Sequence, residues 1–275
     1  MLHCPEGMQY QRYSGVRGSG IYLGRGTGTA GDGPMAAGID YLQRLPFGTQ
    51  MVLMDGRKFR FSVAGGTVLV IGNVKQAAAN VANHVDITAV ASALASRAPT
   101  ATLGATAATA DQYFGGYAIV SVTPDGSNTY LIANHDAVAS AGIITLNLAA
   151  GHAVRTSAWT TTSRIDLIKH PYDSVIIMPT AATGVAVGVA ITPLAAYLTT
   201  GAALSFGWLQ TRGLCGVLTN GTLVLGEGVH TGITTAGAVT AASTTFDEPF
   251  TIQVGRVQRV AATTAFSPIF LTIDG

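Results

Sequence analysis

The chain has 275 residues, of which 48% are hydrophobic and 11% charged, and its formal net charge is +1. Charged residues usually make up about 25% of a soluble domain, so we expect much of this surface to be covered in an assembly or by a membrane. The near-zero net charge, without a basic block, disfavours nucleic-acid binding. The length suffices for one large or two ordinary domains, each with a buried core.

Residues 1–45 differ from the rest, because they are rich in glycine and lack apolar periodicity. Their beginning also lacks the apolar core of a signal peptide. Such a segment cannot bury enough surface to fold alone. We therefore expect an arm that stays loose, packs on its own core or becomes ordered on a neighbouring subunit. Interface cores favour aromatic residues, and the candidate anchors are Tyr10, Tyr13, Tyr22 and Leu23.

A glycine motif within this arm, Gly26 to Gly31, matches G-x-G-x-x-G literally. The dinucleotide-binding version needs a strand before it and a helix after it. Here Asp32-Gly33-Pro34 follows and stops a helix before its N-terminus can be presented. We therefore expect no nucleotide, and the sequence indicates no other cofactor.

Strand signals begin at Phe47, where MVLMDGRKFRFSVAGG reads as two strands joined at Asp55-Gly56. Asp-Gly between apolar runs is a strong hairpin signal. The alternation after the turn predicts one core face and one polar face, Phe59, Phe61 and Val63 against Lys58, Arg60 and Ser62. The charge cluster around this turn is interpreted as the solvated face of a hairpin rather than a catalytic group.

A β-branched run that ends at a glycine, GGTVLVIGNV at 65–74, has an echo in NGTLVLGEGV at 220–229. A looser echo is FTIQVGRV at 250–257. Glycine at such places suits a bulge or a sharp corner. The echo is too irregular for a solenoid period, and it indicates two similar small β units.

The stretch 77–98 is the best helix candidate, because alanine is frequent and Asp86 suits a helix cap. Its apolar residues do not settle the period, however, and we expect loop and strand there. Further on, YAIVSV and TYLIAN flank a second turn at Asp125-Gly126. The same pattern continues in GIITLNLA, SRIDLIKHPYDSVIIMP, FGWLQTRGLCGVLTN and SPIFLTIDG.

These patterns predict an all-β protein of short antiparallel strands, arranged in one or two small barrel or sandwich units. The predicted divisions are an extended glycine-rich arm at 1–45, a first β unit with a connecting segment at 46–110, and a main β domain at 111–275.

The run from Ser174 to Thr211 carries no charged residue and is longer than the about 20 residues of a spanning helix. Pro179 and Pro193 interrupt it, and threonine and glycine are scattered through it. Neither end carries the cluster of positive charge that marks a cytoplasmic side. We interpret this run as buried strands with polar turns and expect no membrane contact.

The local signatures of catalysis and metal binding are missing from the sequence. The six histidines never occur within four residues of one another, so no H-x-x-x-H face exists. The two cysteines, Cys4 and Cys215, have no metal-type spacing, and whether they pair stays open. No G-x-S-x-G elbow occurs, although folding brings distant carboxylates together in some enzymes. We expect neither a metal site nor an enzyme.

Several stretches resemble virion structural proteins of tailed bacteriophages, in the group that contains head decoration, or cement, proteins. They are FGTQMVLMDGRKFRFSVAGGTVLVIGNVKQA, TLGATAATADQYFGGYAIVSVTPDGSNTYLIANHDAVASAGIITLNL, HPYDSVIIMP, FGWLQTRGLCGVLTNGTLVLGEGV and VGRV with the closing FLTIDG. Together they cover most of residues 45–275, and the arm is the least matched part.

This resemblance implies a non-enzymatic shell component, often a homotrimer, made in the bacterial host cytoplasm. It implies attachment to the major capsid protein on the outside of the phage head. A tail or baseplate component is the alternative within virions. Outside virions, the alternative is a secreted carbohydrate-binding β-sandwich with an exposed aromatic face. Of the tryptophans, Trp208 lies in an apolar strand and is expected in the core.

Overall fold

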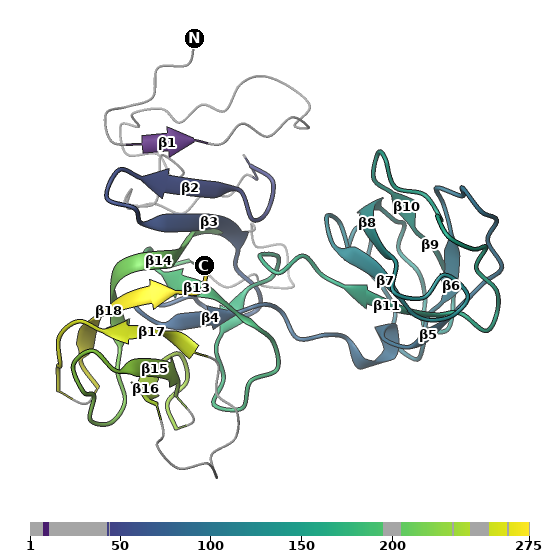
Figure 1. Cartoon of the computed structure of the whole chain (residues 1–275). Coiled ribbons are helices and arrows are strands. Elements are labelled where there is room, and N and C mark those ends of the chain that lie inside the picture. Colours follow the sequence, from purple (N-terminus) through teal and green to yellow (C-terminus); the bar gives the residue numbers. More distant parts are fainter. Residues whose placement is uncertain are drawn as a thin grey trace. The chain divides into compact units, whose positions relative to one another are not determined.

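The computed structural model describes residues 8–10 (backbone only), 43, 45–194, 205–232, 234–242, 253–262 and 264–274. Within these ranges the chain forms eighteen strands, and all pairings between named strands are antiparallel (Figure 1). The one helix of the described part is a 3₁₀ turn, η1 (Ala82–His84). The predicted all-β class is therefore confirmed.

The chain forms two compact units (Figure 1). Unit 1 comprises Met1–Ala78 and Pro171–Gly275, and unit 2 comprises Ala79–His170. Unit 2 is thus inserted into unit 1, and the boundary predicted between 110 and 111 falls inside it. The first β unit predicted at 46–110 is likewise divided, because β3 pairs with β14 about 150 residues later. Local patterns reveal strands but not such distant partners.

Eleven strands of unit 1 share one sheet, whose main path runs β1-β2-β3-β14-β18-β17-β15-β16, with β4, β12 and β13 joined beside it. Their bounds are β1 (Met8–Tyr10), β2 (Gln50–Leu53), β3 (Lys58–Val63), β4 (Val74–Gln76), β12 (Ile176–Ile177), β13 (Ala186–Ala190), β14 (Phe206–Leu218), β15 (Gly228–Thr231), β16 (Val239–Ala241), β17 (Gln253–Val257) and β18 (Phe266–Thr272).

The long strand β14 contributes to three apolar clusters of unit 1. Phe206 and Trp208 pack with Phe59 and Phe61 of β3, and the rings of Phe61 and Phe206 stack at 5.8 Å. Leu209 points to the opposite face of the strand and contributes to a second cluster. Farther along, the apolar side chains of β14 join a third cluster with β15, β17 and β18. Trp208 is buried, as its apolar strand predicted.

The predicted hairpin is confirmed, since β2 and β3 pair around the turn at Asp55-Gly56. Its polar face, however, is not simply solvated. Arg60 is about one-fifth exposed and donates to the two carboxylate oxygens of Asp274 from Nε at 2.8 Å and from Nη2 at 2.9 Å. Ser62 is fully buried and donates to the main-chain oxygen of Gly207. The wet-face interpretation was wrong for these two residues, because the C-terminal end of the chain and β14 cover them.

Unit 2 holds one seven-stranded sheet in the order β10-β8-β7-β11-β5-β6-β9. The strands are β5 (Ile87–Ala89), β6 (Thr100–Thr102), β7 (Tyr117–Val122), β8 (Thr129–Asn134), β9 (Ile143–Thr145), β10 (Asn147–Leu148) and β11 (Arg164–Ile168). The hairpin predicted around Asp125-Gly126 is confirmed as β7–β8. The stretch 77–98 forms η1, β5 and loops, as expected.

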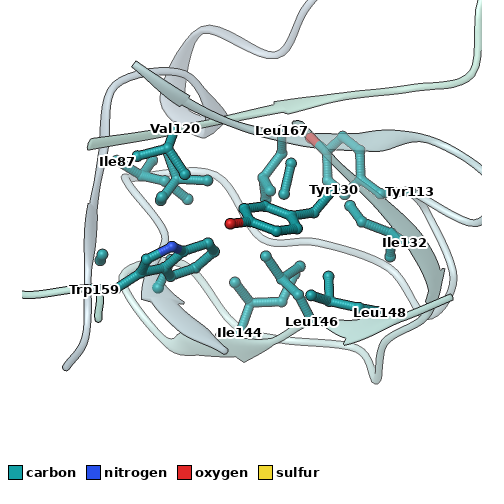
Figure 2. Packing of buried hydrophobic residues seen from close by; sticks show 14 of the residues in the cluster. Ile87, Tyr113, Val120, Tyr130, Ile132, Ile144, Leu146, Leu148, Trp159 and Leu167 are labelled. Carbon is teal, nitrogen blue, oxygen red and sulfur yellow. The ribbon is translucent and has the colours of Figure 1, made fainter. Parts of the chain in front are cut away.

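Asp125 joins the β7–β8 turn to the core of unit 2. The carboxylate is 3% exposed and accepts hydrogen bonds from the Tyr130 hydroxyl at 2.5 Å and from Trp159 Nε1 at 2.8 Å. The main-chain nitrogens of Thr156 and Ser157 donate to its other oxygen. The rings of Tyr130 and Trp159 meet edge to face within the apolar cluster that Figure 2 shows. A polar turn residue therefore anchors two of the largest buried side chains.

Two sequence interpretations need correction. The β-branched run at 65–74 suggests a strand, but of its residues only Val74 belongs to one, β4, and Leu69 forms an isolated bridge with Leu194. The echoed stretches also lie together in unit 1, so they do not mark two similar units. As for the uncharged run from Ser174 to Thr211, its described parts contain β12, β13 and the start of β14. No helix in the described ranges is long and apolar enough to span a membrane.

Candidate interface groove

The edge of β14 is paired along only part of its length. On one side, β3 pairs with Phe206 to Arg212 and then ends, because the hairpin turns at Asp55-Gly56. On the other side, β13 pairs with Leu209 and Gln210, and β18 pairs with Arg212 to Leu218. Among the described residues, positions 214–217 therefore have a neighbouring strand, β18, on one side alone.

Hydrogen-bond alternation shows which groups face the open side. In antiparallel pairs, successive residues direct their main-chain groups to opposite sides. Thr219 donates toward β18, to Ala265, whereas Leu218 donates in the other direction, to Gly72. The same parity directs the N–H and C=O groups of Leu214 and Gly216 away from β18. Gly216 also lies opposite Pro268, which has no N–H to donate.

Gln210 satisfies part of this open edge from within the strand. Its side-chain amide donates to the main-chain oxygens of Arg212 at 3.0 Å and Leu214 at 2.9 Å. The amide group thus takes the place that a paired strand would occupy at the start of the open stretch. Beyond it, the N–H of Gly216 faces the open side, whereas its carbonyl oxygen lies beside Gly72, where an added Cβ would stand 3.3 Å from it.

Close packing closes the two ends of the open stretch. At one end the left-handed Gly213 lies against Arg57, where an added Cβ would stand 2.8 Å from the arginine Cγ. At the other end the left-handed Gly72 lies against the Phe266 ring. Between them is a hollow of about 410 Å³, which we call the β14 groove. Its lining residues are Arg57, Ile71, Ala190, Ile191, Gln210, Leu214, Cys215, Gly216 and Phe266.

Large apolar side chains are exposed around the β14 groove. Leu214 is 51% and Phe266 53% exposed, and Ile71 and Phe270 are also exposed. Leu214 stands directly opposite Phe270 in the strand pair, so these side chains share one face. The charge of Arg57 is matched by Asp55, 2.6 Å away. Exposed apolar clusters with a polar rim are typical of protein-binding surfaces.

Cys215 lines the groove as a free, buried thiol. Burial raises the pKa of this thiol to about 12, and the positive charge of Arg57 offsets the rise in part. A thiol with so high a pKa stays protonated at neutral pH, whereas the thiolate is the nucleophile and metal ligand. No cluster of three or more His, Cys, Asp or Glu suited to a metal ion occurs in the described ranges.

The buried histidines of unit 2 have structural partners. His84 Nδ1 lies 2.5 Å from the Tyr113 hydroxyl, and His84 Nε2 lies 2.9 Å from the main-chain oxygen of Thr106. His135 Nε2 accepts a hydrogen bond from the main-chain nitrogen of Tyr113.

Both tryptophans are buried: the exposed fraction is 1% for Trp159 and 4% for Trp208. Neither tryptophan therefore presents the exposed ring face that the carbohydrate-binding alternative requires.

Two buried polar side-chain atoms of the described part have no hydrogen-bond partner, Lys75 Nζ and Trp208 Nε1. Lys75 is fully buried on β4, between β12 and β13. Burial lowers its pKa from 10.5 to about 7. A neutral amine is a nucleophile in some enzymes, but Lys75 lines no part of the groove and has no solvent access. A buried amine without a partner destabilises the native state.

The predicted anchors lie largely beyond the described ranges. Tyr10 is the last residue of β1, which pairs with β2 so that Tyr10 stands opposite Met51. Tyr13, Tyr22 and Leu23 lie outside the described residues, as does the glycine motif of the arm. Sequence reasoning missed the groove itself. A usable signal for it was the sequence SPIFLT at 267–272. Its apolar residues occupy successive positions, which predicts a strand with apolar side chains on both faces.

Comparisons with known proteins add no identification. No protein-family model matches the sequence, and no significant match appears among curated proteins or among solved structures.

Proposed function

We propose that this protein is a non-enzymatic structural component of a tailed-phage virion that binds the outside of the head as a cement protein. Its partners would be the major capsid protein and further copies of itself, in a homotrimer. Support comes from the resemblance of its strand patterns to this class and from a chain with only 11% charged residues.

The observation that carries the proposal is the exposed apolar face around the β14 groove. Side chains of the size of Leu214, Phe266 and Phe270 each stabilise a protein by about 1.5–3 kcal/mol when fully buried. Leaving several of them in water beside an open strand edge favours a protein whose surface is completed by association.

The expected mechanism is mechanical. A filled head fails when its subunits separate under internal pressure, and a protein lying across their junctions adds contacts that must break first. Interfaces of standard size bury about 1,600 Å². Repetition around the shell makes many weak contacts act together. A protein with this role needs complementary surfaces and strands rather than catalytic groups.

The proposal is tested by locating the protein on virus particles that carry its gene. Antibodies raised against the purified chain, detected with gold particles in the electron microscope, are expected to label the outside of heads. Labelling confined to tails or baseplates would support the alternative within virions and contradict the cement role. Absence of label from intact and from disrupted particles would contradict any virion role. Pre-incubation of the antibody with purified protein provides the control.

A further inference from the structure

We infer that the β14 groove receives Ile21–Leu23 of a neighbouring copy of this chain as an added strand. This inference rests on the proposed function in one respect, the association of copies with one another. It names the partner of the groove, a segment of the same sequence between β1 and β2.

The groove is built for an extended backbone. Its wall is the open edge of β14, where Gly216 presents its main-chain N–H away from β18. An added strand gains affinity from main-chain hydrogen bonds and specificity from alternate side chains. A Cβ added at Gly216 would have nothing within 4 Å, so the face of the sheet is open at this position.

The chemistry of the segment fits that of the groove. The sequence from Gly18 to Gly24, GSGIYLG, carries no charge. Its apolar run begins with Ile21 and Tyr22, two residue types that are enriched in strands. The groove is lined mainly by apolar residues, and its one cation, Arg57, is paired with Asp55. A neutral, apolar strand thus meets a neutral, apolar site.

The direction of the chain favours a neighbour's groove over its own. In the β1–β2 pair Met8 stands opposite Leu53, beside the hairpin turn, whereas Tyr10 stands opposite Met51, farther from it. The chain also enters β2 at Gln50, away from the turn. The groove lies beyond the turn, next to Arg57. Tyr10 and Gln50, which flank the segment between β1 and β2, therefore both lie at the end of the hairpin that faces away from the chain's own groove.

The reach is sufficient for this arrangement. The twelve steps from Tyr10 to Tyr22 span at most about 40 Å when extended. That span exceeds the lengths of the paired strands β1 and β2, so Tyr22 can reach past the edge of its own copy. A head-to-tail contact of this kind generates a closed ring when the rotation closes, which suits the proposed trimer.

Photo-crosslinking tests this inference in the full-length protein. Tyr22 is replaced by p-benzoylphenylalanine, which keeps an aromatic ring, and Thr27 carries the same group in a control protein. Irradiation of the Tyr22 variant is expected to give covalent dimers, with residue 22 joined to peptides containing 213–218 or 266–270 by mass spectrometry. Crosslinks within one chain, crosslinks to other sites, or yields no higher than for the Thr27 control would each overturn the inference.

A matched pair of edge variants provides a second test. Gly216→Pro removes the N–H that faces the groove, whereas Gly216→Ala keeps it, and proline is tolerated on an edge whose N–H faces the open side. The proline variant is expected to lower dimer crosslinking at least fivefold and the alanine variant less than twofold. Equal crosslinking in both would contradict strand addition. Head labelling is measured separately, so failure of the cement role and failure of this contact are distinguishable.

Discussion

Gln210 donates through its side-chain amide to the main-chain oxygen of Leu214, 2.9 Å away and four residues along the same strand. Gln210 is 2% exposed and makes a second bond to Arg212. One buried side chain therefore satisfies two carbonyls of β14 where its pairing with β3 stops. The N–H of Gly216, farther along the strand, faces the open side of β14.

Gln210→Met is expected to destabilise unit 1, because it leaves the carbonyls of Arg212 and Leu214 without their buried donor. The free energy of unfolding in urea should fall by about 1–3 kcal/mol, the cost of an unsatisfied buried polar group. Gln258→Met, at an exposed position, is the control and should change it by less than about 0.5 kcal/mol. Equal effects would show that the amide is not structural.

Asp274→Asn tests the ion pair that joins the end of the chain to β3. Burial acts to raise the pKa of Asp274, but the hydrogen bonds and charge of Arg60 outweigh it, and the pKa lies below its usual value. We expect a loss of about 1–3 kcal/mol near pH 7, since both partners are largely buried. Asp55→Asn, at the more exposed pair with Arg57, should cost at most about 1 kcal/mol in the same urea titration. A larger cost at Asp55 would contradict this ranking.

Asp125→Asn is expected to destabilise unit 2 by about 2–4 kcal/mol, because the carboxylate holds Tyr130 and Trp159 together. Burial acts to raise the pKa of Asp125, but hydrogen bonds from these side chains and from Thr156 and Ser157 lower it overall. A depressed native pKa adds stability above the unfolded value of about 4, and this contribution is lost as the pH falls through the native pKa.

Urea titrations from pH 7 down to pH 2 measure this effect. The difference between wild type and Asp125→Asn should shrink as the pH falls below about 4. Asp136→Asn, an exposed residue in the same unit, serves as the control. A difference that is independent of pH would show that the charge of Asp125 does not stabilise the turn.

Lys75→Met is expected to stabilise the protein by about 1–3 kcal/mol at pH 7, because it removes a buried amine without a partner. The native pKa is about 7, against 10.5 ordinarily. Between these values the unfolded chain binds the proton and the native chain does not, so wild-type stability rises with pH. The advantage of Lys75→Met should therefore shrink from pH 7 to pH 10 in urea titrations. Exposed Arg259→Met should show no such trend, and a flat difference for Lys75→Met would contradict the assignment.

Local strand patterns were readable from the sequence because they depend on neighbouring residues. The Asp-Gly turns at 55–56 and 125–126 and the alternation of Phe59, Phe61 and Val63 led directly to β2, β3, β7 and β8. The inserted second unit was not readable, because it depends on pairings such as Phe61 with Trp208. Such pairings join residues whose order in the sequence carries no signal of their contact.

The groove was not predicted, for a related reason. It exists because β3 begins only at Lys58, opposite Arg212, while β14 continues to Leu218. The limits of strands are set by packing as much as by composition. The run at 65–74 shows the same effect: its β-branched residues suit a strand, but Val70 and Ile71 are exposed in a loop. The exposed Leu214 and Phe266 likewise differ from core residues in that no element of the described part covers them.

The mass of the purified protein in solution, measured by light scattering during size-exclusion chromatography, tests most directly whether this chain exists to associate. The account predicts a stable species of three times the 28.1 kDa chain mass across a tenfold range of micromolar concentrations. A species of 28.1 kDa that persists at the highest concentration would contradict it.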